Sequence, residues 1–371
     1  MTDSALLVMG VETSCDETGV AVVEACPACP ERSRSELAEG DGTRLRSNVV
    51  ASSERFHRRF GGVVPEIASR KQVEVISAVA RQALDEAGVA WPQLAAVAVT
   101  YAPGLVGSLV VGVCFAKAVA FAHRLPLVAV HHIEAHIYAH FLVAESQPGA
   151  AVPQGVSPPR FPFLALVVSG GHSDLVAVRG HGRYQVLGRT RDDAAGEAFD
   201  KGARLLGLGY PGGPAIDAAA ARGDRGVVGF PRARIEGDWD FSFSGVKTAL
   251  ARYLRDTPKA EQRSTADLAA SYQEAVVEPL VEKSVAAAQS LGFERLLVAG
   301  GVANNTRLRE LMAERAAEGG IEVRFPPPEL CTDNAAMVAS AGYFRYRRGD
   351  VSGLHLDARA AAGLNAGADA G

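Results

Sequence analysis

The segment LLVMG-VETSCDET-GVAVV, residues 6–23, decides the fold, because a second segment of the same design begins at Phe163 and reads FLALVV-SGGHS-DLVAV. Each segment has an apolar strand, a short polar turn and a second apolar strand. Two such hairpins in the two halves of one chain indicate a duplicated fold with facing turns. Turns of this kind offer backbone N–H groups to an anion, usually phosphate. We therefore expect a nucleotide-like ligand to bind between two lobes.

Around the hairpins, apolar strands alternate with helical stretches, which is typical of an α/β fold. We expect an N-terminal lobe over residues 1–125, a C-terminal lobe over 126–347 and a disordered tail over 348–371. Residues 25–46, rich in Pro, Glu, Arg and Gly, predict a long loop before a third strand. Helices are expected over 65–88, 107–124, 195–208, 213–222, 242–255, 264–291 and 334–347, and further strands over 94–100, 296–299 and 321–325.

Composition is ordinary for a globular protein, with 48% apolar and 22% charged residues among 371. The net charge of −4 argues against a strongly basic nucleic-acid binder, although Arg55, Arg58 and Arg59 form a local basic group. No apolar run is an uninterrupted membrane span, and no basic stretch precedes the first one. Five irregularly spaced cysteines fit a reducing compartment, with Cys26 and Cys29 as two loop cysteines or a zinc knuckle. We expect a cytoplasmic protein that does not bind membranes.

The histidines form the sharpest local feature, because four of the nine fall within ten residues: His131, His132, His136 and His140. The last three are spaced i, i+4 and i+8, which predicts that they share one face of a helix. Imidazoles at i and i+4 can bind one metal ion. The segment therefore predicts a metal site, against the alternative that the histidines are structural.

Glu134 and Asp333 decide what kind of metal site this is. Glu134 lies two positions after His132, about 200° around a helix, so it is badly placed to act as the base of a metalloprotease HExxH motif. A third ligand must come from elsewhere, and Asp333 is a candidate in the segment CTDN that precedes the last helix. Its alternative role is to cap that helix.

Further turns supply polar groups for a ligand. The first hairpin turn concentrates Glu12, Asp16 and Glu17 with hydroxyl and thiol groups, which fits a phosphate–metal site or, alternatively, a polar hairpin tip. The strand that ends at Gly300 leads into an Asn-containing helix start where a flat group can lie against backbone. The segment YPGGP, residues 210–214, opens a helix that carries Asp217.

Ten motifs occur in order and together resemble one family, the bacterial TsaD (Gcp/Kae) family of tRNA N6-adenosine threonylcarbamoyltransferases, once described as glycoproteases. The resemblance spans about residues 6–347. It implies a duplicated two-lobe actin/Hsp70-like (ASKHA) ATPase fold. The implied activity transfers a threonylcarbamoyl group from threonylcarbamoyl-AMP to N6 of the adenosine 3′ of the anticodon in tRNAs reading ANN codons. The motifs are GVETSCDET (10–18), GGVVPEIASR (61–70), PGLVG (103–107), HHIEAH (131–136), VSGGH (168–172), DDAAGEAFDK (192–201), YPGGP (210–214), FSFSGVKT (241–248), AGGV (299–302) and CTDN (331–334).

The resemblance also implies cofactors, partners and roles for individual residues. One metal ion per subunit, iron in first place and zinc as the alternative, is expected beside ATP or threonylcarbamoyl-AMP. The expected partners are tRNA, an inactive TsaB-like paralogue and a small TsaE-like P-loop ATPase. The implied ligands of the metal are His132, His136 and Asp333; the implied catalytic residues are Asp16 and Glu12; the implied substrate contacts are Val167, Val168, Ser169, Gly170, Gly171, Asp200, Gly213, Asp217 and Asn305.

The chain departs from the family pattern at a few positions. Residues 25–46 are longer than the usual connection, and His140 belongs to no family motif, so it is not taken as a ligand. Asn304 stands where many members have another residue, which leaves open whether Asn304 or Asn305 contacts substrate. The competing functions are a metalloprotease, suggested by the clustered histidines, and a non-catalytic nucleotide-binding scaffold.

Overall fold

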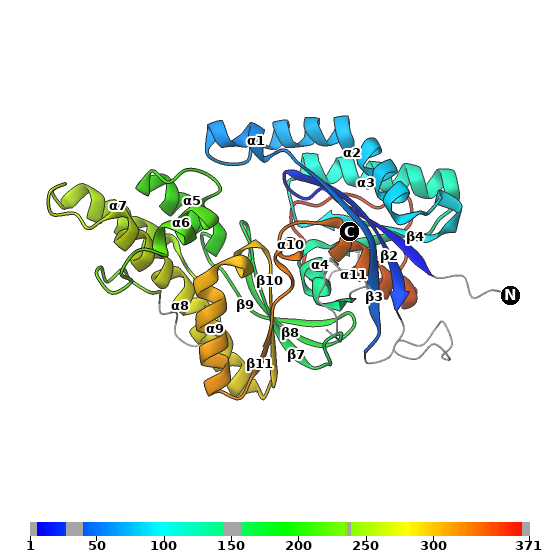
Figure 1. The fold of residues 1–371 in the computed structure, drawn as a ribbon. Coiled ribbons are helices and arrows are strands. Elements are labelled where there is room, and N and C mark those ends of the chain that lie inside the picture. The colour runs from blue at the N-terminus through cyan, green and yellow to red at the C-terminus, as the bar shows by residue number, and fades with distance from the viewer. Residues whose placement is uncertain (1–5, 27–39, 144–156, 234, 236–238, 366–371) are drawn as a thin grey trace.

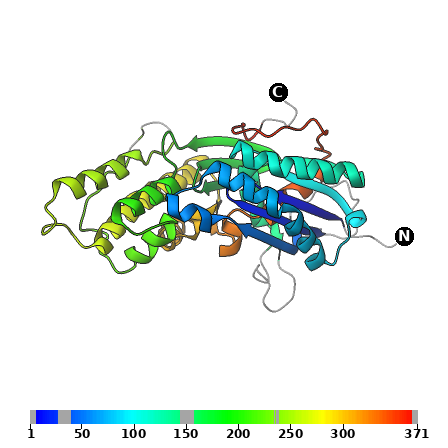
Figure 2. The same ribbon diagram turned by 90° about the horizontal axis from the view of Figure 1, so that it is seen from above.

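Two β-sheets carry the two predicted hairpins (Figures 1 and 2). The computed structural model describes residues 6–26, 40–143, 157–233, 235 and 239–365. The first sheet has the order β5-β4-β1-β2-β3-β6 and the second the order β11-β10-β7-β8-β9. The strands of the first sheet are β1 (Leu7–Glu12), β2 (Glu17–Cys26), β3 (Gly42–Ser52), β4 (Leu94–Ala102), β5 (Leu127–His131) and β6 (Leu142–Val143). Those of the second are β7 (Phe163–Val168), β8 (Ser173–Gly180), β9 (Arg183–Arg189), β10 (Arg295–Ala299) and β11 (Glu322–Arg324).

The pairing of the strands confirms the predicted duplication. In each sheet an antiparallel hairpin continues into a third antiparallel strand: β1-β2-β3 in the first and β7-β8-β9 in the second. A later strand then pairs in parallel with the first strand of the hairpin, β4 with β1 and β10 with β7. The apolar strands are nearly continuous because both faces of each sheet are covered by helices.

The helices form layers outside and between the sheets (Figure 1). On the first sheet, α2 (Pro65–Ala87) and α3 (Val106–His123) cover one face. Between the sheets lie α4 (His132–Tyr138) and α11 (Ala335–Arg347), in a core shared by residues of both sheets. The remaining helices are α1 (Glu54–His57), η1 (Arg58–Phe60), η2 (Trp91–Gln93), η3 (Ala139–Phe141), α5 (Ala195–Leu206), α6 (Gly212–Ala220), α7 (Ser244–Asp256), α8 (Thr265–Leu291), η4 (Gly301–Asn304), α9 (Thr306–Glu318) and α10 (Pro328–Cys331).

Glycines in the first hairpin let α11 lie directly on it. A Cβ atom on Gly10 would stand 2.4 Å from both the carbonyl oxygen of Ala335 and the nitrogen of Ala339. On Gly19 it would stand 3.0 Å from the nitrogen of Ala335. Side chains at these two positions would push the helix away. The close approach places the start of α11, and with it Asp333, beside the first hairpin turn.

Three sequence predictions need correction. The strands β5 and β6 follow residue 125 but pair in the first sheet, and α11 packs on that sheet, so a division at residue 125 separates parts of one layer. Residues 348–365 are not a disordered tail: Leu356 and Leu364 are buried, and the backbone N–H of Arg359 donates to the carbonyl of Tyr101 at 2.9 Å. Residues 366–371 lie outside the described part. Of residues 25–46, expected to form a loop, the outer ones lie in strands, because β2 continues to Cys26 and β3 begins at Gly42; residues 27–39, with Cys29, lie outside the described part.

Helix α3 is the one helix of the described chain that is long and apolar enough to cross a membrane, by length and composition alone. The sequence prediction of no such run is therefore too strong. Its residues Val113, Ala116 and Ala120 are buried in the core of the first lobe, where the helix packs against β4.

Candidate active site and metal centre

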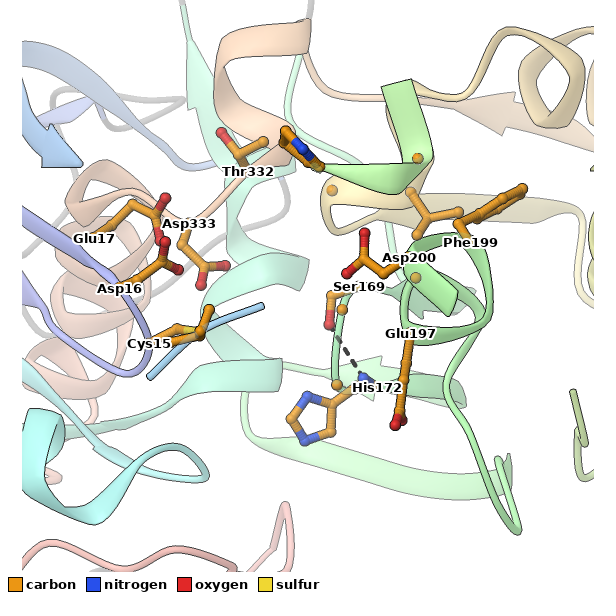
Figure 3. Close-up of a pocket in the computed structure, with 18 of the residues that line it drawn as sticks. Cys15, Asp16, Glu17, Ser169, His172, Glu197, Phe199, Asp200, Thr332 and Asp333 are labelled. Atoms are coloured by element: carbon orange, nitrogen blue, oxygen red, sulfur yellow. Dashed lines mark hydrogen bonds between the residues drawn. The ribbon is translucent and has the colours of Figure 1, made fainter. Parts of the chain in front are cut away.

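A cavity of about 960 Å³ lies between the turns of the two hairpins. Figure 3 shows Cys15, Asp16 and Glu17 on one side, and Ser169 and the α5 residues on the other. The hairpin prediction is confirmed in this respect, because both turns line the same space. Of the described residues that line it, none is a lysine or an arginine.

The predicted metal triad comes together at one edge of this cavity. The Nε2 atoms of His132 and His136 lie 3.6 Å and 3.3 Å from Oδ1 of Asp333. The ligand atoms of the three residues all lie within 4.8 Å of one another. Helix α4 supplies the two imidazoles, one turn apart. The carboxylate comes from the loop before α11, 197 residues after His136 in the chain (333 − 136).

The residues present fit a metal ion. His136 is fully buried, and neither of its ring nitrogens has a hydrogen-bond partner among the described residues. A buried imidazole without partners is costly unless it binds something. The alternative role of Asp333 is excluded, because the side chain of Asn334 caps α11 by accepting from the N–H of Met337 at 3.0 Å.

Electrostatics tie the triad together. Burial lowers the pKa of His132, but the carboxylates of Asp333 and Glu12 outweigh it and raise that pKa to about 9. Burial raises the pKa of Asp333, yet the charge on His132 and the close approach of His136 hold that pKa well below its usual range. Burial lowers the pKa of His136. These pKa shifts favour a protonated His132 beside an ionised Asp333, with His136 neutral.

Glu12 lies behind His132 and not in the cavity. Its carboxylate accepts from Thr100 Oγ1 at 2.7 Å and from the backbone N–H of Ser14 at 2.5 Å. Oε2 also lies 3.3 Å from Nδ1 of His132, and Ser14 Oγ lies 3.2 Å from the same nitrogen. Because Glu12 is fully buried and does not line the cavity, it orients His132 so that Nε2 faces Asp333.

His140 and Glu134 take no part in the triad. Helix α4 tightens into η3 after Tyr138, so His140 leaves the shared face and its Nε2 lies 3.2 Å from the carbonyl of Val298. The prediction that three histidines share one helix face is wrong for His140. The carboxylate of Glu134 is fully buried, accepting from Tyr184 at 2.8 Å and from Arg345 at 2.6 Å.

The first turn brings Asp16 and Glu17 into the cavity, beside Asp333 (Figure 3). The turn is held by Ser53, whose hydroxyl and backbone N–H donate to the carbonyl of Asp16 at 2.7 and 3.2 Å. Burial and the charge of Asp16 raise the pKa of Glu17 well above its usual range. Glu17 and Asp16 therefore disfavour each other's charge within the turn.

The second turn presents backbone to the cavity. Ser169 Oγ accepts from the N–H of His172 at 3.2 Å, while the N–H of Ser169 donates to the His172 carbonyl at 2.8 Å. A Cβ atom on Gly170 or Gly171 would meet nothing within 4 Å. The two glycines thus face the open space of the cavity, which matches the expected approach of an anion to backbone.

The other predicted substrate residues fall into two groups. Asp200 lines the cavity and accepts from the N–H of Gly212 at 2.7 Å, and burial raises the pKa of Asp200. Gly213 lines it with open space in front. Val167 and Val168 lie within β7, are fully buried and do not line the cavity, because strand side chains there point into the two cores.

Asp217 and Asn305 line the cavity but also build the start of α9. Asp217 Oδ2 accepts from the hydroxyl and N–H of Thr306 at 2.8 and 3.2 Å. Asn305 caps the helix by accepting from Leu308 N–H at 2.9 Å, and its amide donates to Asp217 at 3.3 Å. Asn304 lines the cavity too, so both asparagines stay candidates.

Sequence reasoning missed several residues that line the cavity. All but Glu54 lie inside the quoted motifs, and the signal that could have found them is their position in a turn whose neighbours were already chosen. They include Ser14, Glu54, His172, Glu197, Tyr210 and Thr332. His172 has a pKa lowered to about 3 by burial and by His132 and His136, so it is neutral.

Comparisons with known proteins agree with the motifs. A sequence profile of the family TsaD, tRNA N6-adenosine threonylcarbamoyltransferase, matches residues 44–340. A relative of that name from Symbiobacterium thermophilum is 50% identical over 361 residues, which cover 97% of this chain and 98% of the relative. Another, from Magnetococcus marinus, is 52% identical over 347 residues, which cover 93% of both chains.

A solved structure shows the same architecture at low identity. The HypF protein of T. kodakarensis aligns with 93% of this chain at a TM-score of 0.56 and 14% identity. The chain spans 47% of that protein, so the likeness concerns the fold alone. Together with the paired sheets, it confirms the duplicated actin/Hsp70-like architecture.

Proposed function

The chain belongs to the tRNA N6-adenosine threonylcarbamoyltransferase family, and we propose that it performs this transfer in the cavity between the two hairpin turns. It is a transferase that modifies an adenosine of tRNA at N6. We take threonylcarbamoyl-AMP as the donor and the adenosine 3′ of the anticodon, in tRNAs reading ANN codons, as the acceptor. The observation that carries the proposal is the triad of His132, His136 and Asp333 at the edge of that cavity.

We propose that this triad holds one divalent metal ion, iron in first place and zinc as the alternative. Two imidazoles and a carboxylate suit either metal. When bound, the ion supplies a Lewis acid for the carbonyl group that is transferred. The contribution of Glu12 is to hold Nδ1 of His132, which fixes the ring with Nε2 toward Asp333.

The remaining residues bind the nucleotide and handle a proton. The N6 amine loses a proton when it attacks, and Asp16 is the carboxylate that we propose to accept it, since it lines the cavity beside Asp333. The backbone at Ser169, Gly170 and Gly171 would face the phosphate. The adenylate leaves readily, so no covalent intermediate with the protein is needed. The other proposed nucleotide contacts are Asp200, Gly213, Asp217 and Asn305.

Neither competing function is favoured. A metalloprotease of the HExxH type would use a glutamate of this helix as its base, and Glu134 is committed to Tyr184 and Arg345. A non-catalytic scaffold would have no need of the triad. The family match supports the transferase over both.

The partners and the cellular location are proposed from the family to which the chain belongs. We propose that the chain acts in the cytoplasm with a TsaB-like paralogue and a TsaE-like P-loop ATPase, on tRNA. The exposed side chains of Val106, Val110 and Phe121 on α3 support a protein partner, because such an apolar helix face is unusual for a surface that meets only water.

The test is mass spectrometry of tRNA nucleosides. The chain is incubated with unmodified tRNA, threonine, bicarbonate, ATP and the two partner proteins. Threonylcarbamoyladenosine is expected, and its formation should stop when the chain is omitted or replaced by His136→Ala. If the product formed equally without the chain, the proposed function would be wrong.

A further inference from the structure

A basic and aromatic surface lies at the rim of the cavity, in the segment between β3 and α2 and in the second turn of α2. We call it the rim surface and define it by Arg55, Phe56, Arg59, Phe60 and Arg70. Glu54 on one side of this segment and Gly62 and Val63 on the other line the cavity. Figure 1 shows α1, which begins the segment, on the side of α2 that faces α5 and α6.

The rim surface is unusual because an aromatic ring and several guanidinium groups are exposed together, with a second, half-buried ring beside them. Phe60 is 52% exposed, although a large apolar side chain is normally buried. The guanidinium carbon of Arg59 lies 4.7 Å from the centre of the Phe60 ring, and that of Arg55 lies 4.7 Å from the Phe56 ring. Such pairs keep both groups at the surface in a defined arrangement.

The charge of the rim surface is not neutralised within the chain. Arg55, Arg59 and Arg70 form no ion pair with any carboxylate of the described residues. Lys71, beside them, is different, because it pairs with Glu74 at 2.6 Å. The cavity itself is lined by carboxylates without a lysine or arginine among the described residues. An RNA backbone that reaches the cavity must therefore find its positive charge at the rim.

Hydrogen bonds fix the rim surface relative to the active site. His57 is fully buried; its Nε2 lies 3.0 Å from Ser53 Oγ, and its Nδ1 accepts from the N–H of Val64 at 3.2 Å. Ser53 in turn holds the carbonyl of Asp16 in the first turn. On the other side, the guanidinium of Arg204 in α5 donates to the carbonyl of Gly61. The segment is thus tied to both lobes that wall the cavity.

We infer that the rim surface binds the single-stranded anticodon loop of the tRNA, with a base stacked on Phe60 and phosphates at Arg55, Arg59 and Arg70. The inference rests on the proposed function, because it takes tRNA as the acceptor. Exposed aromatic rings with flanking arginines are the usual platform for unpaired bases and their phosphates. An adenosine that enters the cavity must leave its stack, and its neighbours then need a surface at the rim.

The experiment measures binding of an unmodified tRNA transcript to the metal-loaded full chain by fluorescence anisotropy at several salt concentrations. Phe60→Ala should weaken binding about tenfold, and Phe60→Trp should restore it. Arg55→Ala and Arg59→Ala should each reduce the slope of log Kd against log salt by about 0.7. Arg315→Ala on α9 removes the same charge from another exposed site and should change neither quantity.

Melting temperature, metal content and ATP affinity are measured on every variant and should stay unchanged, which shows that the fold and the cavity are intact. The inference would be overturned if Phe60→Ala bound tRNA as tightly as wild type. It would also be overturned if the rim variants kept tRNA binding but no longer bound a protein partner. The proposed function fails separately, if the wild-type chain binds tRNA through this surface but makes no threonylcarbamoyladenosine.

Discussion

The two hairpins share one design, but their glycines serve opposite purposes. In the first hairpin, Gly10 and Gly19 face α11, and an added Cβ at Gly10 would stand 2.4 Å from helix backbone. In the second, Gly170 and Gly171 face open space, with nothing within 4 Å of an added Cβ. The same residue type is therefore required for packing in one hairpin, and in the other it leaves room for a ligand.

The chemistry of the two turns differs in the same way. The first turn carries Glu12, Asp16 and Glu17, close to His132 and Asp333. The second turn, residues 169–173, carries no carboxylate. In this duplicated fold, the first hairpin turn suits a cation and the second suits an anion. We call them the cation side and the anion side of the cavity. If this division is correct, changes on one side should leave the binding property of the other side intact.

The largest effect is expected from Asp333→Ala, which removes a ligand from the cation side. Loss of a residue that only orients a ligand costs about 10–100-fold in metal affinity, so loss of the ligand itself should cost at least about 100-fold. Transfer activity should fall below detection while ATP affinity is kept. Metal content and calorimetry check this. Glu329→Ala removes an exposed carboxylate four residues earlier and serves as the control; full metal occupancy in Asp333→Ala would contradict the assignment.

Gly10→Ala should reduce the free energy of unfolding by about 1–3 kcal/mol, because the added methyl group forces α11 away from β1. Denaturation curves measure this. The control is Gly245→Ala in the first turn of α7, where a Cβ meets nothing within 4 Å and stability should hold or rise. Metal affinity should also fall in Gly10→Ala, since α11 follows Asp333. Equal stability of the two variants would show that the helix does not depend on this glycine.

Glu12→Gln should lower metal affinity about 10–100-fold without unfolding the chain, because the amide keeps its size but loses the charge beside His132. Metal titration of the apo-protein reads this directly. Glu66→Gln, which makes the same change at an exposed carboxylate in the first turn of α2, is the control and should leave metal affinity unchanged. A loss of transfer activity in Glu12→Gln at full metal occupancy would instead favour a direct catalytic role.

Periodic patterns carried most of the fold prediction. The helix over 65–88 appears as Pro65–Ala87, and Gly88 ends it with a φ of 65°, as a left-handed cap requires. Val73 has the helical spacing of the buried residues Ile76 and Ala80 but is itself exposed, because sequence spacing cannot tell which edge of an apolar stripe reaches the core. The ordered structure of residues 348–365 was not predicted, because these residues are positioned by contacts with distant segments, such as the one between Arg359 and Tyr101.

The site was predictable where motif and spacing agree. His132 and His136 follow from local helix geometry, whereas the choice of Asp333 as third ligand needed the family resemblance. The role of Glu12 behind His132 was not predictable, because the depth of a side chain below a cavity wall depends on packing between β1, β4 and α4. The separation of His140 from the triad depends on the change from α4 to η3, which the i+8 spacing does not encode.

Gly170→Ala should give the smallest effect, and it tests the comparison most directly. The position has open space around it, so stability should stay within about 0.5 kcal/mol of wild type, unlike that of Gly10→Ala. ATP affinity should fall about tenfold, or about 1.4 kcal/mol, because the methyl group takes the space in which a phosphate approaches the backbone. Metal affinity should not change, since the triad lies on the other side. If Gly170→Ala instead unfolded as readily as Gly10→Ala and still bound ATP normally, both hairpins would owe their glycines to packing, and the division into a cation side and an anion side would not hold.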